Sequence, residues 1–271
     1  MPGFAFQAAV AGARPLVAMA WGSDVLLTSR TQSLAARVAA RRAQLVMADS
    51  DALVDATVAL GAKRKNTMLV QWGVDLEQFS PPDGPRAEVR ARLGLAPGPL
   101  IMSPRSIMPV YNIPTIVEAF GVLAGDRPDL QLSVKHMGID APDLGELPHP
   151  DRVHVIGHVP HDALADHYRA AEVCVSVASS DSSPRSAWEA LACGTPLVVS
   201  DLPWVHELLE HEKTAMIVPI ESRAIAGAVA RILDEPKLAE RLAREGRRLV
   251  AEHHDRRREM DRIADAYRRL V

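Results

Sequence analysis

The sequence predicts an α/β protein with two doubly wound, parallel-sheet domains of the Rossmann-like kind. Short apolar runs alternate with segments whose apolar residues recur at helical spacing, which is the pattern of a parallel sheet with crossover helices. A chain of 271 residues, 48% of them hydrophobic, is long enough to bury two cores. We place the first domain at residues 1–78 and the second at residues 79–255.

The composition argues against a nucleic-acid-binding, a secreted or a membrane-spanning protein. A formal net charge of -3 argues against a dedicated nucleic-acid binder. Cys174 and Cys193 lie in apolar surroundings without metal-ligand spacing, so we expect free buried thiols in a reducing compartment. No apolar run reaches the ~18 residues that span a bilayer, and the start of the chain lacks the charged region of a secretory signal. We therefore expect a cytoplasmic location.

Strands and helices are expected to alternate along the first domain. The expected order is a helix end over 1–13, a strand over 15–20, a helix over 28–42, a strand over 44–48, a helix over 52–60 and a strand over 67–71. Its sheet therefore has only about three strands. Polar turns follow these strands, including Trp21-Gly22-Ser23-Asp24 and Asp49-Ser50-Asp51.

The second domain repeats the alternation with more strands. After a linker over 81–97 with a short helix, we expect strands over 99–103, 130–134, 153–156, 173–177, 197–199 and 215–219. Helices are expected over 113–123 and 159–170, between Ser186 and the stop signal Gly194, and from about 222 to the end of the chain.

The stretch SSDSSPRSAWEALACGT, residues 179–195, is the strongest functional signal. It forms a polar loop between a strand and a helix, and a helix N-terminus at the carboxyl end of a parallel strand is a common phosphate site. Asp181 and Glu189 bracket it. A structural alternative is that Ser186 and Glu189 form a capping box and that Asp181 closes a turn.

The longer wording SDSSPRSAWEALACGTPLVVSD resembles the donor-site signature of retaining, family-4-type (group 1) glycosyltransferases with the GT-B fold. The resemblance implies a GT-B-like chain whose first domain is incomplete, because the family normally begins several strands earlier. It also implies that Glu189 binds the ribose of a nucleotide sugar, that Asp181 faces the sugar, and that Ser182 and Ser183 lie near the diphosphate. Asp181 is one methylene shorter than the Glu usual in the family.

The resemblance assigns further residues around the donor. Arg105 matches an arginine that neutralises the donor diphosphate, and the alternative is a surface residue at a strand end. The lysine that accompanies this arginine in the family is absent, so we expect either that Arg185 replaces it or that catalysis is weak. Gly157 and His158 would lie by the nucleotide base. The helix N-terminus at Ser186 would share in binding the diphosphate.

Other matches concern the acceptor and the end of the chain. The turn containing Gly22 and Asp24 resembles the family's acceptor-side turn. In the family the last helix, here residues 256–271, returns to the first domain. The basic run Arg256–Arg258 suggests contact with an anionic membrane surface or with a lipid-diphosphate acceptor, whereas the alternative is a solvated helix face.

No metal or other cofactor is expected. The D-x-D spacing at Asp49-Ser50-Asp51 occurs in the metal sites of another glycosyltransferase fold, but here it ends a strand and is explained by helix N-capping. His154, His158, His161 and His167 lack the cysteines or acids that would complete a coordination set.

The expected function is retaining transfer of a sugar from a nucleotide sugar to a sugar, lipid-linked or small-molecule acceptor. Two alternatives are a non-catalytic or truncated nucleotide-sugar-binding module and a nucleotide-sugar epimerase of GT-B shape. With an incomplete first domain, we expect this chain alone to bind donor but to transfer sugar slowly or not at all. An unpaired strand edge would also favour self-association.

Overall fold

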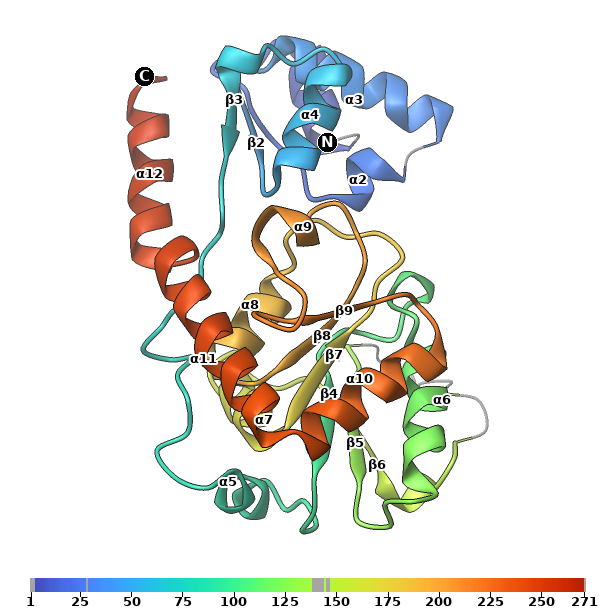
Figure 1. Cartoon of the computed structure of the whole chain (residues 1–271). Coiled ribbons are helices and arrows are strands. Elements are labelled where there is room, and N and C mark those ends of the chain that lie inside the picture. Colours follow the sequence, from blue (N-terminus) through green and yellow to red (C-terminus); the bar gives the residue numbers. More distant parts are fainter. Residues whose placement is uncertain (1–2, 28, 138–143, 145–146, 271) are drawn as a thin grey trace.

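The computed structural model describes residues 3–27, 29–137, 144 and 147–270. It contains two parallel-sheet units, one above the other in Figure 1, and the chain passes between them once near residue 73 and again near residue 254. The expectations for Met1, Thr28 and Val271 concern positions outside the described ranges.

The first sheet has three parallel strands in the order β1 (Val17–Met19), β2 (Leu45–Ala48) and β3 (Thr67–Leu69), as predicted. One face packs against three helices, α1 (Phe4–Val10), α3 (Arg30–Arg42) and α4 (Asp51–Ala59), largely through alanines. Small side chains let these helices approach the sheet closely. The other face is covered by Ile263 of the last helix, α12 (Arg256–Arg268). Figure 1 shows α12 running beside β3.

The second sheet has six parallel strands in the order β6-β5-β4-β7-β8-β9, and it is also confirmed as doubly wound. The strands are β4 (Leu100–Ser103), β5 (Gln131–Lys135), β6 (Val153–Ile156), β7 (Val173–Ser176), β8 (Leu197–Ser200) and β9 (Met216–Val218). The strand order reverses between β4 and β7. In open α/β sheets this switch point is where the crevice for ligands forms, at the carboxyl ends of the strands.

Helices cover both faces of the second sheet. They are α5 (Arg86–Arg92), α6 (Ile113–Ala124), α7 (Leu164–Ala170), α8 (Arg185–Ala192), α9 (Val205–Leu208), α10 (Ser222–Asp234) and α11 (Pro236–His253). Helices α7 and α8 pack on one face and α6 and α10 on the other, while α11 contributes to both cores. The helix expected over 159–170 begins only at Leu164, and residues 161–163 form a turn before it. The turn expected at residues 21–24 is partly helical, since α2 spans Ser23–Leu26.

The crossing back to the first domain is built around His254. Its backbone C=O accepts from the N–H of Val74 at 2.7 Å, and the N–H of Arg256 donates to the C=O of Val74 at 3.1 Å. The buried imidazole stacks on Trp188 of α8, with ring centroids 3.8 Å apart. Both ring nitrogens lack a hydrogen-bond partner within the described part of the chain. Burial, reinforced by the nearby His253 and Arg258, lowers the pKa of His254 to about 3.

A neutral buried histidine should make folding sensitive to acid. Between pH 6.5, the ordinary pKa of histidine, and about pH 3, His254 is protonated in the unfolded chain but neutral in the folded chain. The free energy of unfolding therefore falls as the pH drops through this range. His254→Phe keeps a flat ring on Trp188 and removes the titration. Between pH 7.5 and 5, the native protein should lose about 2 kcal/mol relative to this variant in urea unfolding. The exposed neighbour His253→Gln serves as the control, and equal pH dependence in native protein and His254→Phe would contradict the assignment.

Candidate active site

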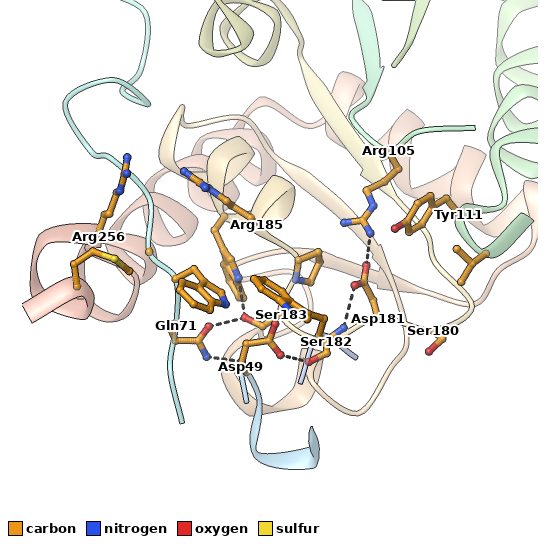
Figure 2. Close-up of a pocket in the computed structure, with 17 residues that line it drawn as sticks. Asp49, Gln71, Arg105, Tyr111, Ser180, Asp181, Ser182, Ser183, Arg185 and Arg256 are labelled. Carbon is orange, nitrogen blue, oxygen red and sulfur yellow. Dashed lines mark hydrogen bonds and ion pairs between the residues drawn. The ribbon is translucent and has the colours of Figure 1, made fainter. Parts of the chain in front are cut away.

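A cavity of about 400 Å³ lies between the two domains, at the switch point of the second sheet (Figure 2). The loops that follow β1, β2, β3, β4 and β7 all contribute to it, together with the start of α12. Its lining residues are Trp21, Asp49, Gln71, Trp72, Gly73, Arg105, Val110, Tyr111, Ser180, Asp181, Ser182, Ser183, Pro184, Arg185, Trp188, Arg256 and Met260.

An ion pair between the ends of β4 and β7 forms one wall. Arg105 Nη2 lies 3.0 Å from Asp181 Oδ2, and Figure 2 shows the two side chains pointing at each other. Arg105 Nη1 also donates to Ser186 Oγ at 3.2 Å, and its guanidinium carbon lies 4.0 Å above the Tyr111 ring. Burial raises the pKa of the Asp181 carboxyl, and the Arg105 charge opposes that rise. Arg105 is thus held in one orientation by three different groups.

The loop between β7 and α8, residues 177–184, is held in an unusual conformation, and we call it the β7–α8 loop. Ser183 has φ 45°, a left-handed geometry that costs free energy for a residue with a side chain. Its hydroxyl donates to Gln71 Oε1 at 2.6 Å and accepts from Trp188 Nε1 at 2.9 Å. A residue of the first domain therefore helps to hold this loop in place (Figure 2).

A second contact between the domains involves a buried carboxyl. Ser182 Oγ donates to Asp49, the residue after β2, and the same hydroxyl lies 3.2 Å from Ser50 Oγ. Burial raises the pKa of Asp49 to about 7, the Ser182 hydrogen bond acts in the opposite direction, and Asp181 and Asp24 add weaker repulsion. Asp49 is therefore partly protonated near neutral pH. Ser50 also accepts from Leu53 N as the N-cap of α4, which confirms the predicted capping role.

The acceptor-side pair, Gly22 and Asp24, lies beside this cavity without lining it. Gly22 has φ 92°, and a Cβ there would lie 2.9 Å from the Cβ of Ser182. Glycine therefore permits the close approach of the first domain to the β7–α8 loop. Asp24 Oδ1 accepts from the N–H of Trp21 at 2.7 Å, which fixes the backbone of a residue that does line the cavity.

Glu189 does not form a capping box, so that alternative was wrong. Helix α8 begins at Arg185 with Pro184 as its N-cap, which places Ala187 at the N3 position where the box requires Glu or Gln. The buried Glu189 carboxylate instead accepts from Tyr168 Oη at 3.0 Å and lies 2.8 Å from His161 Nε2. Arg185 Nε lies 3.1 Å from the same carboxylate.

The structure brings together some of the residues singled out in the sequence and separates others. One cavity is lined by Arg105, Asp181, Ser182, Ser183 and Arg185. Two further residues contact this lining without belonging to it: Ser186 contacts Arg105, and Glu189 contacts Arg185. Gly157 and His158 are exposed after β6 and do not line it.

Several lining residues were missed as site residues, namely Trp21, Asp49, Gln71, Trp72, Tyr111 and Arg256. The available signal was their position, because most of them directly follow a parallel strand of either sheet.

Metal and membrane features can be stated for the described part of the chain. There, no group of three or more His, Cys, Asp or Glu side chains is arranged to hold a metal ion. Over the same residues, no helix has the length and apolar character needed to cross a membrane.

Comparisons with known proteins point to one family. The family model described as "Glycosyl transferases group 1" matches residues 86–249. A D-inositol 3-phosphate glycosyltransferase of Streptomyces bingchenggensis is 32% identical over 221 residues, which cover 76% of this chain and 47% of that protein. An alpha-D-kanosaminyltransferase of Streptomyces kanamyceticus is 28% identical over 190 residues, which cover 68% of this chain and 49% of that protein. The chain thus spans about half the length of these relatives.

Solved structures agree on the fold. Sucrose-phosphate synthase from Thermosynechococcus elongatus has a TM-score of 0.81 at 25% identity, over 94% of this chain and 67% of that one. Anabaena HepE in complex with UDP-glucose has a TM-score of 0.83 at 21% identity, over 97% of this chain and 76% of that one. The second likeness concerns the fold alone.

The buried Asp49 should give stability a second pH dependence. Because its folded pKa is raised from 3.8 to about 7, the folded state binds the proton more tightly, and this contribution is lost as pH rises through that window. Asp49→Asn retains an acceptor for Ser182 and removes the charge. Its stability relative to native protein should increase by up to about 3 kcal/mol between pH 5 and 8, measured by urea unfolding. Asp51→Asn, at the exposed start of α4, is the control, and a pH-independent difference for Asp49→Asn would refute the raised pKa.

Proposed function

Because the chain belongs to the group 1 glycosyl transferases, we propose that it transfers a sugar from a nucleotide-sugar donor to an acceptor, with retention of the anomeric configuration. The observation that carries the proposal is the Arg105–Asp181 pair. It lies in the cavity at the switch point of the second sheet and inside the segment matched by the family model. A cation and a hydrogen-bond acceptor side by side suit a diphosphate joined to a sugar.

In this proposal Arg105 stabilises the negative charge that develops on the departing nucleoside diphosphate. Its contacts with Tyr111, Ser186 and Asp181 fix the guanidinium before the donor arrives, so little reorganisation is needed during the reaction. The first N–H groups of α8 add to the same charge stabilisation. Arg185, which lines the cavity, supplies a second cation, and the donor diphosphate is therefore neutralised without a metal ion.

Glu189 then has two roles in donor binding. Its carboxylate accepts from the ribose hydroxyls, and it also orients Arg185 and His161, both of which contact it. The side chains of Arg185 and His161 are each 45% exposed, whereas that of Glu189 is 5% exposed. The two exposed partners can therefore move aside to admit a ribose, while the Tyr168 hydroxyl keeps Glu189 in place.

Donor binding is the first test. We expect a nucleoside diphosphate and its sugar to bind in the micromolar to millimolar range without added divalent metal, in a thermal-shift panel of UDP-, GDP- and ADP-sugars. A ligand at ~100 times its dissociation constant adds ~2.7 kcal/mol, which raises the melting temperature by several degrees for a chain of this size. The UDP-glucose complex of HepE makes the UDP-sugars the first choice. If no ligand shifts the melting of folded protein, the proposal fails.

Turnover separates the proposed reaction from its alternatives. A transferase releases nucleoside diphosphate only when an acceptor is present. An epimerase would convert the donor sugar without an acceptor, and a binding module would show neither reaction. The anomeric configuration of the product, read by NMR, tests retention.

Arg185 offers a sharper test of how the donor is held. Arg185→Ala should weaken binding of the nucleoside diphosphate by roughly 10- to 100-fold, the range expected for charged hydrogen bonds, and should change binding of the free nucleoside much less. Arg223→Ala, an exposed arginine on α10, is the matched control. Equal losses for diphosphate and nucleoside would show that Arg185 does not bind the phosphates.

A further inference from the structure

Two tryptophans from separate loops of the first domain form a stacked pair at the cavity. Trp21 follows β1 and Trp72 follows β3, and their ring centroids lie 5.2 Å apart with an angle of 9° between the planes. Both residues line the cavity together with the β7–α8 loop. The pair therefore faces the same space as Arg105 and Asp181, but from the opposite domain.

Trp21 is poorly covered for so large an apolar side chain. It is 58% exposed although it lies in a concave site, and Trp72 supports one face of its ring. Aromatic side chains of this size contribute strongly to binding when a ligand removes them from water. Val110, Tyr111 and Met260 extend the apolar lining. These side chains form an apolar part of the cavity lining beside the polar part that contains Arg105 and Asp181, and apolar and aromatic linings are common in small-molecule pockets.

Several polar groups of the cavity already have partners within the protein, although Trp72 Nε1 has no hydrogen-bond partner among the described residues. Asp49 accepts from Ser182, and Asp181 is paired with Arg105. Gln71 uses both ends of its amide, because Oε1 accepts from Ser183 and Nε2 donates to the backbone C=O of Asp49 at 2.9 Å. An acceptor whose hydroxyls bonded to Asp49 or Gln71 would have to replace these hydrogen bonds, whereas a ring that stacks on Trp21 leaves them in place.

We infer that the Trp21–Trp72 pair binds the acceptor, and that this acceptor is a flat aromatic ring carrying a hydroxyl group. The inference rests on the proposed transferase function and names the acceptor class for the same site. The ring stacks on Trp21 and directs its hydroxyl toward Asp181 and Arg105. The hydroxyl oxygen forms the new bond to the anomeric carbon, the bond from that carbon to the diphosphate oxygen breaks, and the hydroxyl proton passes to the departing diphosphate.

The experiment measures acceptor binding directly, by isothermal titration of the 271-residue chain. The probes are 4-methylumbelliferone as a flat hydroxylated ring, cyclohexanol as a ring that is not flat, and methyl α-D-glucoside as a sugar. Each is titrated with and without the nucleoside diphosphate that binds best. We expect 4-methylumbelliferone to bind more tightly than the other two.

Variants assign that binding to the tryptophan pair. Trp21→Ala should weaken binding of 4-methylumbelliferone by about 5- to 10-fold, the scale of one aromatic stacking contact. Trp21→Phe should recover most of that loss because it restores a flat ring. Tyr267→Ala removes an exposed aromatic of α12 outside the cavity and should have no effect. Thermal unfolding of each variant verifies that it is folded.

The outcomes distinguish this inference from the proposed function. Nucleotide binding together with tighter binding of the sugar or of cyclohexanol, or with no effect of Trp21→Ala, overturns the aromatic acceptor and leaves donor binding intact. Binding of 4-methylumbelliferone through Trp21 without any nucleotide binding supports the ring site and overturns the transferase. If neither the nucleotides nor 4-methylumbelliferone binds, both the transferase function and the aromatic acceptor are overturned.

Discussion

The site depends on the contacts by which the first domain holds the β7–α8 loop in its conformation. Ser182 is held by Asp49 and Ser183 by Gln71, while the left-handed backbone at Ser183 would be costly without such support. Outside this loop, Glu207 of α9 also joins the two domains, because its carboxylate accepts from two N–H groups at the start of α4, at 2.8 and 2.9 Å. The contacts with the loop itself come from Asp49 and Gln71, which follow β2 and β3.

The two crossings of the chain between the domains reinforce that arrangement. Val74 pairs with His254 and Arg256, and Gly73, with φ 70°, leaves no room for a side chain against the backbone of Arg256. The close approach brings Arg256 to the cavity from α12, and Trp72 reaches it from the adjoining strand end. Parts of the chain that are distant in sequence thus line one cavity, because the two crossings lie against each other beside it.

Sequence periodicity predicted the two sheets because each strand is a buried apolar run and each helix has an apolar face. The resemblance to group 1 glycosyltransferases, rather than periodicity, singled out Arg105, Asp181 and Arg185, and these residues do share one cavity. The contribution of Asp49 and Gln71 could not be predicted in this way. Their partners lie more than a hundred residues away in the chain, and the pairing exists only because the two domains meet. The start of α8 was misplaced because Pro184, rather than a serine, occupies the N-cap.

Charge balance within the cavity has a consequence for the proposed reaction. Arg105 is paired with Asp181 and Arg185 with Glu189, so each of these two arginines is neutralised by a carboxylate of the protein. A diphosphate can gain from these arginines only by competing with the carboxylates, and burial makes the charged form of Asp181 costly once Arg105 turns away. The hydroxyls of the donor sugar can offset that cost by donating to Asp181. The site would then bind the diphosphate best when a sugar is attached to it. It would therefore select a complete nucleotide sugar over a free nucleoside diphosphate.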